Sequence, residues 1–387
     1  MADYGDIIGS DDSDAGDELE ENAEDMRRYW YEPLYYPMRI GQVLDQRYRI
    51  EHKLGHGGFS TVWMAHDSRT ETDVALKVLG VTASQTNTEI AMHREIRQRV
   101  TDTSRFLLSQ HTFSLSGPMG THKVLVFPLQ GPNLQRCFFS MSLASRMSIA
   151  EQVLKALESL HNGNIVHRDL SDKNIICGMQ PMSHINTTTK YQFFGRPRKI
   201  LVQPHTNWTG EIVLPMQVPA NLLTGSVYLS DFGISIRAGT QVECKQQTPS
   251  CWCAPERFHN VNPTAASDMW SFMCIFAKLY LGALPWSPYG EPLAEMVKIF
   301  GSLPQRWKGC FCYPQRANSS WYDPRITPET SLDALITRAR PDVDSTERSY
   351  VAHVLRRGFA YEPDERITAR QLLQDAHFQN ILRRYVN

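Results

Sequence analysis

The sequence contains a glycine cluster and four polar side chains whose types together suit phosphoryl transfer. The cluster is Gly55–Ser60, and it is followed along the chain by Lys77, Asp169, Asn174 and Asp231. Phosphoryl transfer depends on positioning and charge neutralisation more than on covalent help from the protein. Glycines let backbone N–H groups approach phosphate oxygens, a lysine supplies positive charge, and carboxylate and amide oxygens are preferred ligands of Mg²⁺. We therefore expect these residues to meet around a phosphate-bearing ligand.

The elements that must position these residues are predicted from periodicity and from turn residues. Four runs are typical of strands: Tyr48–Leu54, Thr61–Ala65, Asp73–Leu79 and Val124–Phe127. Lys77 lies on the third of them, and a helix is predicted over Thr88–Val100. In the second half, an amphipathic helix ends at Gly163, which we expect to be a left-handed cap, and Met269–Leu281 is apolar enough to be a buried helix. Strands followed by helices predict an α+β fold with two unequal lobes.

Six short motifs occur in a fixed order within these predicted elements. They are Gly55–Ser60, Val74–Lys77, Glu95 on the predicted helix, His167–Leu170 with Asn174, Asp231–Gly233 and Ala254–Glu256. The ordered set resembles the signature of eukaryotic protein kinases. Within that family the chain is most similar to the serine/arginine-protein kinase branch found in fungi, through Arg39–Tyr48, Lys53–Trp63 and Leu125–Leu134. The resemblance, from about Tyr48 to Phe378, implies a bilobal fold with a small β-rich N-lobe and a larger helical C-lobe.

The resemblance also implies a role for each motif residue in binding ATP and two Mg²⁺ ions. Lys77 would hold the α and β phosphates, and Glu95 would fix Lys77 through an ion pair. Asn174 and Asp231 would hold the magnesium ions, while Asp169 would orient the substrate hydroxyl and accept its proton.

The adenine site can be predicted in the same way. Val62 and Ala75 would form its roof, Ile176 its floor and Phe127 its back, with residues 128–131 as the hinge. The full set of predicted nucleotide contacts is Leu54, Gly55, His56, Gly57, Gly58, Phe59, Ser60, Val62, Ala75, Lys77, Phe127, Gln130 and Ile176.

Two positions depart from the family pattern. Ser171 stands two residues after Asp169, where serine/threonine kinases usually carry a lysine, and we expect Lys173 to supply the missing charge. Tyrosine kinases often place a cation at the position of Lys173, four residues after the catalytic aspartate, so specificity for tyrosine hydroxyls stays open. Arg99, four residues past Glu95, takes a position that is normally apolar and belongs to the hydrophobic stack between the lobes. These departures leave a second hypothesis, a pseudokinase scaffold that binds nucleotide or partners with little catalysis.

Further interactions follow from the resemblance. Glu256 should pair with Arg366, and Asp268 should anchor the catalytic loop from the buried helix. From residue type and position alone, we also predict that Arg168, beside the catalytic aspartate, binds a phosphate on the activation segment. The candidate acceptors of that phosphate are Thr240, Thr248 and Ser250.

Charge and composition predict the domain organisation. Residues 1–25 contain eleven Asp or Glu and no Lys or Arg, which leaves an excess of ten positive charges in the rest of the chain. We predict a disordered acidic tail and an extended lead-in before the kinase domain. The predicted bounds are 1–28 for the tail, 29–47 for the lead-in and 48–382 for the kinase domain, with N-lobe 48–127, hinge 128–131, C-lobe 132–382 and an insertion at about 178–226.

The insertion contains a basic run, Arg196–Lys199. We interpret this run as part of a solvated loop, with a nuclear address or a nucleic-acid contact as alternatives. A nucleic-acid-binding protein is a third functional hypothesis, but the sequence lacks the interleaved aromatic residues such proteins use for stacking, so we do not expect a nucleic-acid partner.

The apolar stretches, the first residues and the cysteine spacing indicate where in the cell the protein is expected and whether it binds zinc. The longest apolar stretch, Cys274–Trp286, is short and contains Lys278, so no membrane span is predicted. The start of the sequence lacks the order of a secretory signal, and the eight cysteines lack zinc-site spacing and should be free thiols. We expect an intracellular protein, cytoplasmic or nuclear, that acts on protein substrates.

Overall fold

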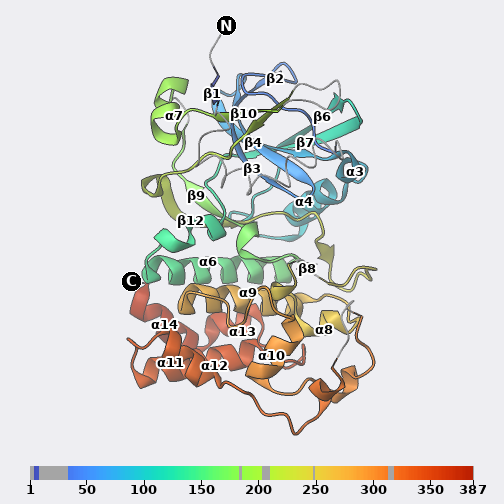
Figure 1. Ribbon diagram of the computed structural model, residues 1–387, viewed down its shortest axis with the longest axis vertical. Coiled ribbons are helices and arrows are strands. Elements are labelled where there is room, and N and C mark those ends of the chain that lie inside the picture. The colour runs from blue at the N-terminus through green and yellow to red at the C-terminus, as the bar shows by residue number, and fades with distance from the viewer. Residues whose placement is uncertain are drawn as a thin grey trace. The chain divides into compact units, whose positions relative to one another are not determined.

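The computed structural model describes residues 4–7, 34–182, 185–202, 210–246, 249–312 and 318–386. The chain forms two compact units, each assembled from segments that are distant in the sequence (Figure 1). The first unit comprises Met1–Thr88, Leu107–Pro132 and Cys177–Thr224, and the second comprises Glu89–Phe106, Asn133–Ile176 and Gly225–Asn387. Strands dominate the first unit and helices dominate the second, which confirms the predicted α+β fold.

The first unit is built on a six-stranded antiparallel sheet with strand order β2-β3-β4-β5-β7-β6. Its strands are β2 (Val43–Leu44), β3 (Tyr48–Gly57), β4 (Ser60–Asp67), β5 (Thr72–Leu79), β6 (His111–Gly117) and β7 (Gly120–Pro128), and a short helix, α3 (Val81–Ser84), follows β5. A buried hydrophobic cluster includes Tyr48, Ile50, Trp63, Leu76 and Val126 from four of these strands. The four strands predicted from the sequence therefore exist and share one core.

Residues 34–47 belong to this core, whereas the sequence predicted an extended lead-in. Met38, Ile40 and Leu44 are buried in the same cluster, and β2 pairs with β3. Tyr35 is also buried, and its hydroxyl donates a hydrogen bond to the carbonyl of Gly57. The lead-in therefore supports the strand that carries the glycine cluster.

The predicted insertion also packs into the first unit. It contains α7 (Thr187–Phe194), β10 (Arg198–Val202) and β11 (Gly210–Val213), and the flanking strands β9 (Ile175–Met179) and β12 (Leu223–Leu229) pair with each other. Five insertion side chains form a second buried cluster with Met64 of β4: Met179, Met182, Phe194, Met216 and Leu222. The described part of the insertion is thus a packed substructure, in contrast to the solvated loop that we expected around the basic run.

Residues 4–7 form a further part of the first unit. β1 (Asp6–Ile7) lies parallel to β10, which pairs antiparallel with β11 on its other edge. These four residues are ordered in the structure, in contrast to the disorder expected for the acidic tail. The remaining tail residues, 1–3 and 8–28, lie outside the described residues.

The second unit is mainly helical. Its helices are α4 (Thr88–Arg99), α5 (Leu134–Cys137), α6 (Leu143–Asn162), α8 (Pro255–Phe258), α9 (Ala265–Leu281), α10 (Pro292–Phe300), α11 (Leu332–Ala339), α12 (Ser345–Gly358), α13 (Ala369–Gln374) and α14 (Ala376–Tyr385). Strand β8 (Ile165–Val166) pairs antiparallel with β13 (Ile236–Arg237) over two residues. Almost every side chain of α9 from Ser267 onward is buried, which confirms the predicted central helix.

Helix α6 ends directly before Gly163, as predicted, but Gly163 is not the left-handed residue. Its φ is −76°, and the following residue, Asn164, has a φ of 57°. Glycine is needed at position 163 for space, because a Cβ there would lie 2.7 Å from Cγ2 of Val100. The expectation of a left-handed glycine cap was therefore wrong, and close packing is the physical reason for the glycine.

Two predicted absences can be compared with the structure. All eight cysteines are free thiols, as expected. In the part of the chain that the structure describes, no helix combines the length and the apolar character that a membrane span requires.

Candidate active site

One face of the sheet in the first unit carries several predicted nucleotide contacts. Val62 of β4 lies opposite Lys77 of β5, Met64 lies opposite Ala75, and Ala75 lies opposite Phe127 of β7. Directly opposite residues share a face of an antiparallel sheet, as do residues two apart on one strand. The register therefore places Val62, Ala75, Lys77 and Phe127 on the same face of the sheet.

The glycine cluster forms a tight hairpin between β3 and β4. Gly57 pairs with Ser60, which leaves Gly58 and Phe59 at the turn. Among the described atoms, a Cβ built on Gly55, Gly57 or Gly58 would meet nothing within 4 Å, and none of the three has a positive φ. Neither internal packing nor backbone conformation accounts for these glycines. An open backbone of this kind fits the close approach of phosphate groups.

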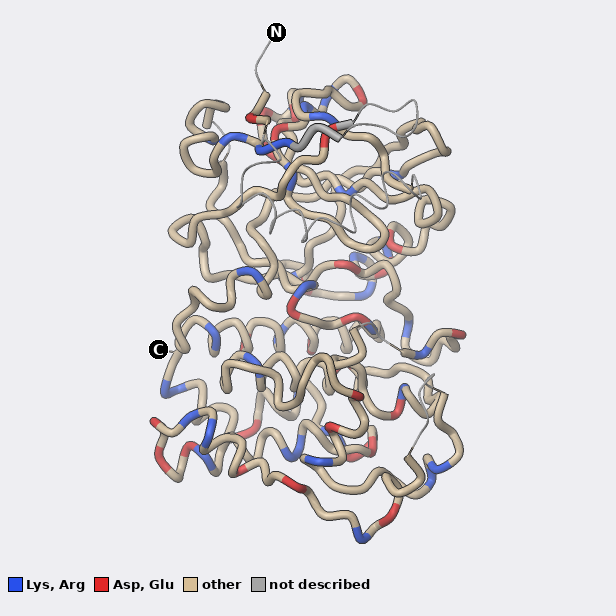
Figure 2. The backbone as a smooth tube through the Cα atoms, in the orientation of Figure 1, with Lys and Arg blue, Asp and Glu red and all other residues tan. Residues whose placement is uncertain are grey.

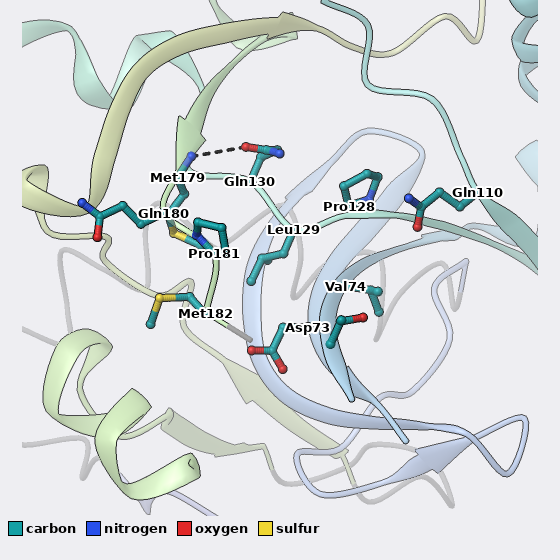
Figure 3. Close-up of a pocket in the computed structure, with 11 residues that line it drawn as sticks. Asp73, Val74, Gln110, Pro128, Leu129, Gln130, Met179, Gln180, Pro181 and Met182 are labelled. Carbon is teal, nitrogen blue, oxygen red and sulfur yellow. Dashed lines mark hydrogen bonds between the residues drawn. The ribbon is translucent and has the colours of Figure 1, made fainter. Parts of the chain in front are cut away.

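The hinge is attached to the first residues of the insertion. Oε1 of Gln130 accepts a hydrogen bond of 3.2 Å from the backbone N–H of Met179 (Figure 3). The N–H of Gly131 donates to the carbonyl of Cys177. A pocket of about 230 Å³ lies beside the hinge and is lined by the start of β5, the hinge and residues 179–182. Gln130 is the only predicted nucleotide contact in its lining, so we do not assign this pocket to the nucleotide.

The insertion also reaches the predicted adenine residues of the first unit. Leu54 and the hinge residue Leu129 pack against the cluster that contains Met64 and Met216. The N–H of Met216 donates a hydrogen bond of 2.8 Å to the carbonyl of Lys53, directly before Leu54. The strand that leads into the glycine hairpin therefore has an insertion segment beside it.

In the second unit, Asp268 of α9 organises the loop that carries Asp169. Its carboxylate accepts hydrogen bonds from the backbone N–H groups of His167 at 2.7 Å and Arg168 at 2.9 Å. His161 Nε2 lies 3.1 Å from the same carboxylate. Although burial opposes ionisation, the hydrogen bonds from His161 and the loop hold the pKa of Asp268 below its usual value. The predicted anchoring role is confirmed.

Asp169 and Asn174 are joined directly. Nδ2 of Asn174 donates to Oδ2 of Asp169 at 2.8 Å and to the Asp169 carbonyl at 2.7 Å. Burial raises the pKa of Asp169 to about 6, and the nearby negative charge of Asp231 adds to the increase. A carboxylate whose pKa is closer to neutral is a better proton acceptor at physiological pH.

Phe232, which directly follows Asp231 in the chain, packs against the loop that carries Asp169. The Phe232 ring is fully buried, with its centroid 5.1 Å from that of His167 and 5.9 Å from those of His93 and Phe106. Asp231 has a φ of 59°, in the left-handed region that residues other than glycine seldom adopt. Such a conformation costs on the order of 1–3 kcal/mol and occurs most often at functional sites.

Helix α4 presents Glu89, rather than the predicted Glu95, to this region. Glu89 is buried, with 7% of its surface exposed. A Cβ placed on Gly233 would lie 3.8 Å from Oε2 of Glu89 and 3.3 Å from Oδ1 of Asp231. Two carboxylates therefore border the same glycine, which directly follows Phe232.

Glu95 instead forms ion pairs near the surface. Its carboxylate accepts hydrogen bonds from Arg237 at 2.6 and 2.9 Å and from Arg99 at 2.7 Å. The bonds from Arg237 and Arg99 lower the pKa of Glu95 to about 2. The structure thus places Glu95 with the start of the activation segment, and we correct its predicted role accordingly.

Helix periodicity explains this correction. The buried positions of α4 are 89, 92, 93 and 96, which form one stripe of the helix, whereas position 95 lies beside that stripe. His93, four residues after Glu89, contacts Phe232, whereas Arg99, which we had placed in the hydrophobic stack, pairs with Glu95 near the surface. The missed signal was the spacing of Glu89, Met92, His93 and Ile96.

The pair between Glu256 and Arg366 is confirmed. Nη1 and Nη2 of Arg366 donate to the two carboxylate oxygens of Glu256 at 2.8 and 2.9 Å, and both side chains are buried. Arg168 donates to the carbonyls of Ile234 at 2.8 Å and Cys244 at 2.7 Å. Phosphorylation of the activation segment stays a prediction, and Thr248 lies outside the described residues.

The remaining predicted residues lie on or next to the catalytic loop. Lys173 is exposed within a 3₁₀ turn, Asp172–Asn174, and Ser171 is buried. Ile176 forms an isolated β-bridge with Asn133. The charge-supplying role of Lys173 and the adenine role of Ile176 stay predictions.

The fold and these motifs are matched by known proteins. A family model described as "Protein tyrosine and serine/threonine kinase" matches residues 48–376. The chain is 24% identical to "Serine/threonine-protein kinase SRPK" of Physarum polycephalum over 96% of this chain and 94% of that protein. It is 35% identical to "Protein kinase dsk1" of Schizosaccharomyces pombe, over 41% of this chain and 30% of that protein.

A solved structure shows the same fold. The chain is similar to a crystal structure of a kinase domain with a TM-score of 0.62, over 90% of this chain and 99% of that one. The sequence identity is 18%, so this likeness supports the fold alone.

Proposed function

Because the chain belongs to the protein tyrosine and serine/threonine kinase family, we propose that it transfers the γ-phosphoryl group of ATP to serine or threonine hydroxyls of protein substrates. The names of the similar proteins, serine/threonine-protein kinases, support this class of hydroxyl. The observation that carries the proposal is the hydrogen bond from Asn174 to Asp169, on a loop that Asp268 anchors. This bond brings the proposed base and a proposed magnesium ligand into contact.

We assign the proton transfer to Asp169. Its carboxylate would accept the proton of the substrate hydroxyl, and Asn174 would hold the carboxylate in one orientation. With a pKa of about 6, Asp169 is ionised at pH 7 and can act as a base. A positioned base of this kind typically contributes about 10²–10⁴-fold to the rate.

The residues that would hold ATP and Mg²⁺ fit these groups. When bound, Mg²⁺ neutralises charge on the β and γ phosphates. The side-chain oxygens of Asn174 and Asp231 are suitable ligands for this hard cation. Lys77 and the backbone of the open glycine hairpin would contact the phosphates, and Val62, Ala75 and Phe127 would contact adenine.

We further propose that Glu89, not Glu95, is the acid that orients Lys77. Glu89 belongs to the buried stripe of α4, and its carboxylate and that of Asp231 both lie next to Gly233. Glu95 is already paired with Arg237 and Arg99. We retain Lys173 as the residue that supplies the charge missing at Ser171.

A labelling experiment tests the proposal. The full chain would be incubated with [γ-³²P]ATP, Mg²⁺ and a mixture of protein substrates, and the labelled amino acids would be identified. We expect phosphoserine and phosphothreonine, and no label above background with Asp169→Asn. Phosphotyrosine as the main product would refute the hydroxyl class. Binding of MgATP without any transfer would favour the pseudokinase scaffold.

A further inference from the structure

Two features of the sequence are not used in the proposed phosphoryl transfer: the acidic first residues and the basic run Arg196–Lys199. The structure brings part of one against the other (Figure 1). In the parallel pairing of β1 with β10, Asp6 lies opposite Arg198 and Ile7 lies opposite Lys199. The N–H of Asp6 donates a hydrogen bond of 2.8 Å to the carbonyl of Pro197. We call residues 4–7 the arm.

Charge complementarity accompanies this backbone pairing. Nε of Arg196 donates to Oδ1 of Asp6 at 2.8 Å, and the Arg196 guanidinium also lies 5.7 Å from the ring centroid of Tyr191. Figure 2 shows acidic and basic positions next to one another where β1 meets β10. Lys199 is buried, with Nζ 3.3 Å from Oε1 of Glu211. The basic run is therefore engaged within the first unit.

The surface that contacts the arm also restricts which residues fit at positions 4 and 5. Gly5 has a φ of 108°, and a Cβ at this position would lie 2.3 Å from the carbonyl oxygen of Pro197. Tyr4 packs against the hydrophobic cluster of the main sheet. Its ring lies so close to Gly41 that a Cβ there would lie 2.4 Å from it. Position 5 therefore requires glycine, and position 4 accommodates an aromatic ring.

The arm is held by short-range interactions of modest strength. The pairing covers two residues, and the ion pair between Asp6 and Arg196 is partly exposed, with 57% and 37% of the side chains accessible. Exposed ion pairs contribute little to stability, and short strand pairings are marginal by themselves. An edge strand left without its neighbour readily accepts another extended segment.

We propose that this edge of β10 is a strand-addition site for an extended acidic peptide, and that the arm occupies it in cis. The partner is a protein segment that offers an aromatic residue, a glycine and an acidic residue in the order Tyr4, Gly5, Asp6. Such a segment replaces the arm, forms the same backbone bonds to β10 and pairs its carboxylate with Arg196. The site lies wholly within the first unit and does not depend on the proposed kinase activity.

A fluorescently labelled peptide of residues 1–14 tests the site by anisotropy. It should bind a variant lacking residues 1–8 at least tenfold more tightly than the full chain, because the tethered arm competes at a high effective concentration. Arg196→Glu in the shortened variant should weaken binding at least tenfold. Arg325→Glu, at an exposed arginine of the second unit with 88% of its side chain accessible, is the matched control and should leave binding unchanged.

Peptide variants identify the kind of partner. A peptide with Gly5→Val should not bind, because a side chain there meets the Pro197 carbonyl. If the shortened variant does not fold, the full chain with Asp6→Lys replaces it and should bind the unmodified peptide more tightly than the wild type does. Equal binding of the Gly5→Val peptide would overturn the proposal. So would equally tight binding of an oligonucleotide of the same charge, or no binding to either variant.

Discussion

The ionisation of Asp169 should set the lower pH limit of activity. Burial raises the pKa of this carboxyl to about 6, and only the ionised form accepts a proton. We therefore predict that kcat/KM rises with pH up to about 6 and then levels off, with a fall of about tenfold for each unit below pH 5. Initial rates at subsaturating protein substrate between pH 4 and 8 measure this profile. A profile that is flat from pH 5 to 8 would contradict the assignment.

The same carboxyl has a predicted effect on stability. Because the folded protein raises its pKa, Asp169 favours the folded state below about pH 4, and this contribution is lost as pH rises through about 6. Above that pH the ionised carboxylate disfavours folding. Asp169→Asn should therefore have a higher Tm than the wild type at pH 8, with a smaller difference at pH 5. Thermal unfolding at the two pH values tests this, and a lower Tm at pH 8 would argue against it.

Glu89 and Glu95 offer a matched comparison on one helix. Glu89→Gln should lower kcat at least tenfold, which corresponds to about 1.4 kcal/mol of transition-state stabilisation, because it removes the proposed partner of Lys77. Glu95→Gln removes surface ion pairs and should change kcat by less than about threefold. Steady-state kinetics of both variants show which of the two glutamates is the partner of Lys77. A severe loss in Glu95→Gln alone would restore the original assignment.

These residues also show where inference from the sequence stops. Asp169 and Asn174 could be assigned because they lie five positions apart in one motif, and the structure joins them by a hydrogen bond. The two glutamates of α4 differ in the sequence only through the spacing of positions 89, 92, 93 and 96, a signal that we missed, and the contact of His93 with Phe232, far along the chain, shows which side of the helix is buried. The family pattern supplied a position for the acid but not the side of the helix that is buried.

At the scale of elements, helix α7 is attached to the sheet by a buried lysine. Nζ of Lys190 lies 2.6 Å from both Oε2 of Glu51 and Oδ1 of Asp73, and all three side chains are at least 95% buried. Lys190→Met would leave two carboxylates without this cation in a place of low dielectric. We predict a loss of about 3–5 kcal/mol in the unfolding free energy of the first unit. Urea denaturation followed by tryptophan fluorescence measures it.

A surface lysine provides the control for this prediction. Lys155→Met on α6 removes a pair with Glu151 in which 59% of the lysine side chain is exposed. Its expected cost is about 0.3–0.5 kcal/mol. Similar losses for both variants would show that the buried cluster does not hold α7 in place.

The success of the element predictions depended on motifs. The pair between Glu256 and Arg366 and the anchoring by Asp268 were predictable, because each partner belongs to a recognisable family motif. Lys190 belongs to no motif, and its ion pairs join residues more than a hundred positions apart. Hydrophobic periodicity could not show that the insertion would fold back onto the sheet.

At the scale of the whole molecule, the order of strands and helices was sufficient to predict the α+β class, and the resemblance of the ordered motifs indicated the family. The sequence did not predict that residues 4–7, the lead-in and the insertion would all join the first unit. Each of these segments was classified by composition, which describes the average of a segment and not the few side chains that anchor it. Tyr4, Tyr35 and Lys190 are such anchors.

The most direct test of the central claim is a paired measurement of MgATP binding and phosphoryl transfer. The full chain and Asp169→Asn would be compared by calorimetric titration with MgATP and by single-turnover transfer to a protein substrate. We predict similar dissociation constants for the two proteins and transfer that is about 10²–10⁴-fold slower in the variant. Equal rates in both proteins, or no MgATP binding by the wild type, would contradict the account.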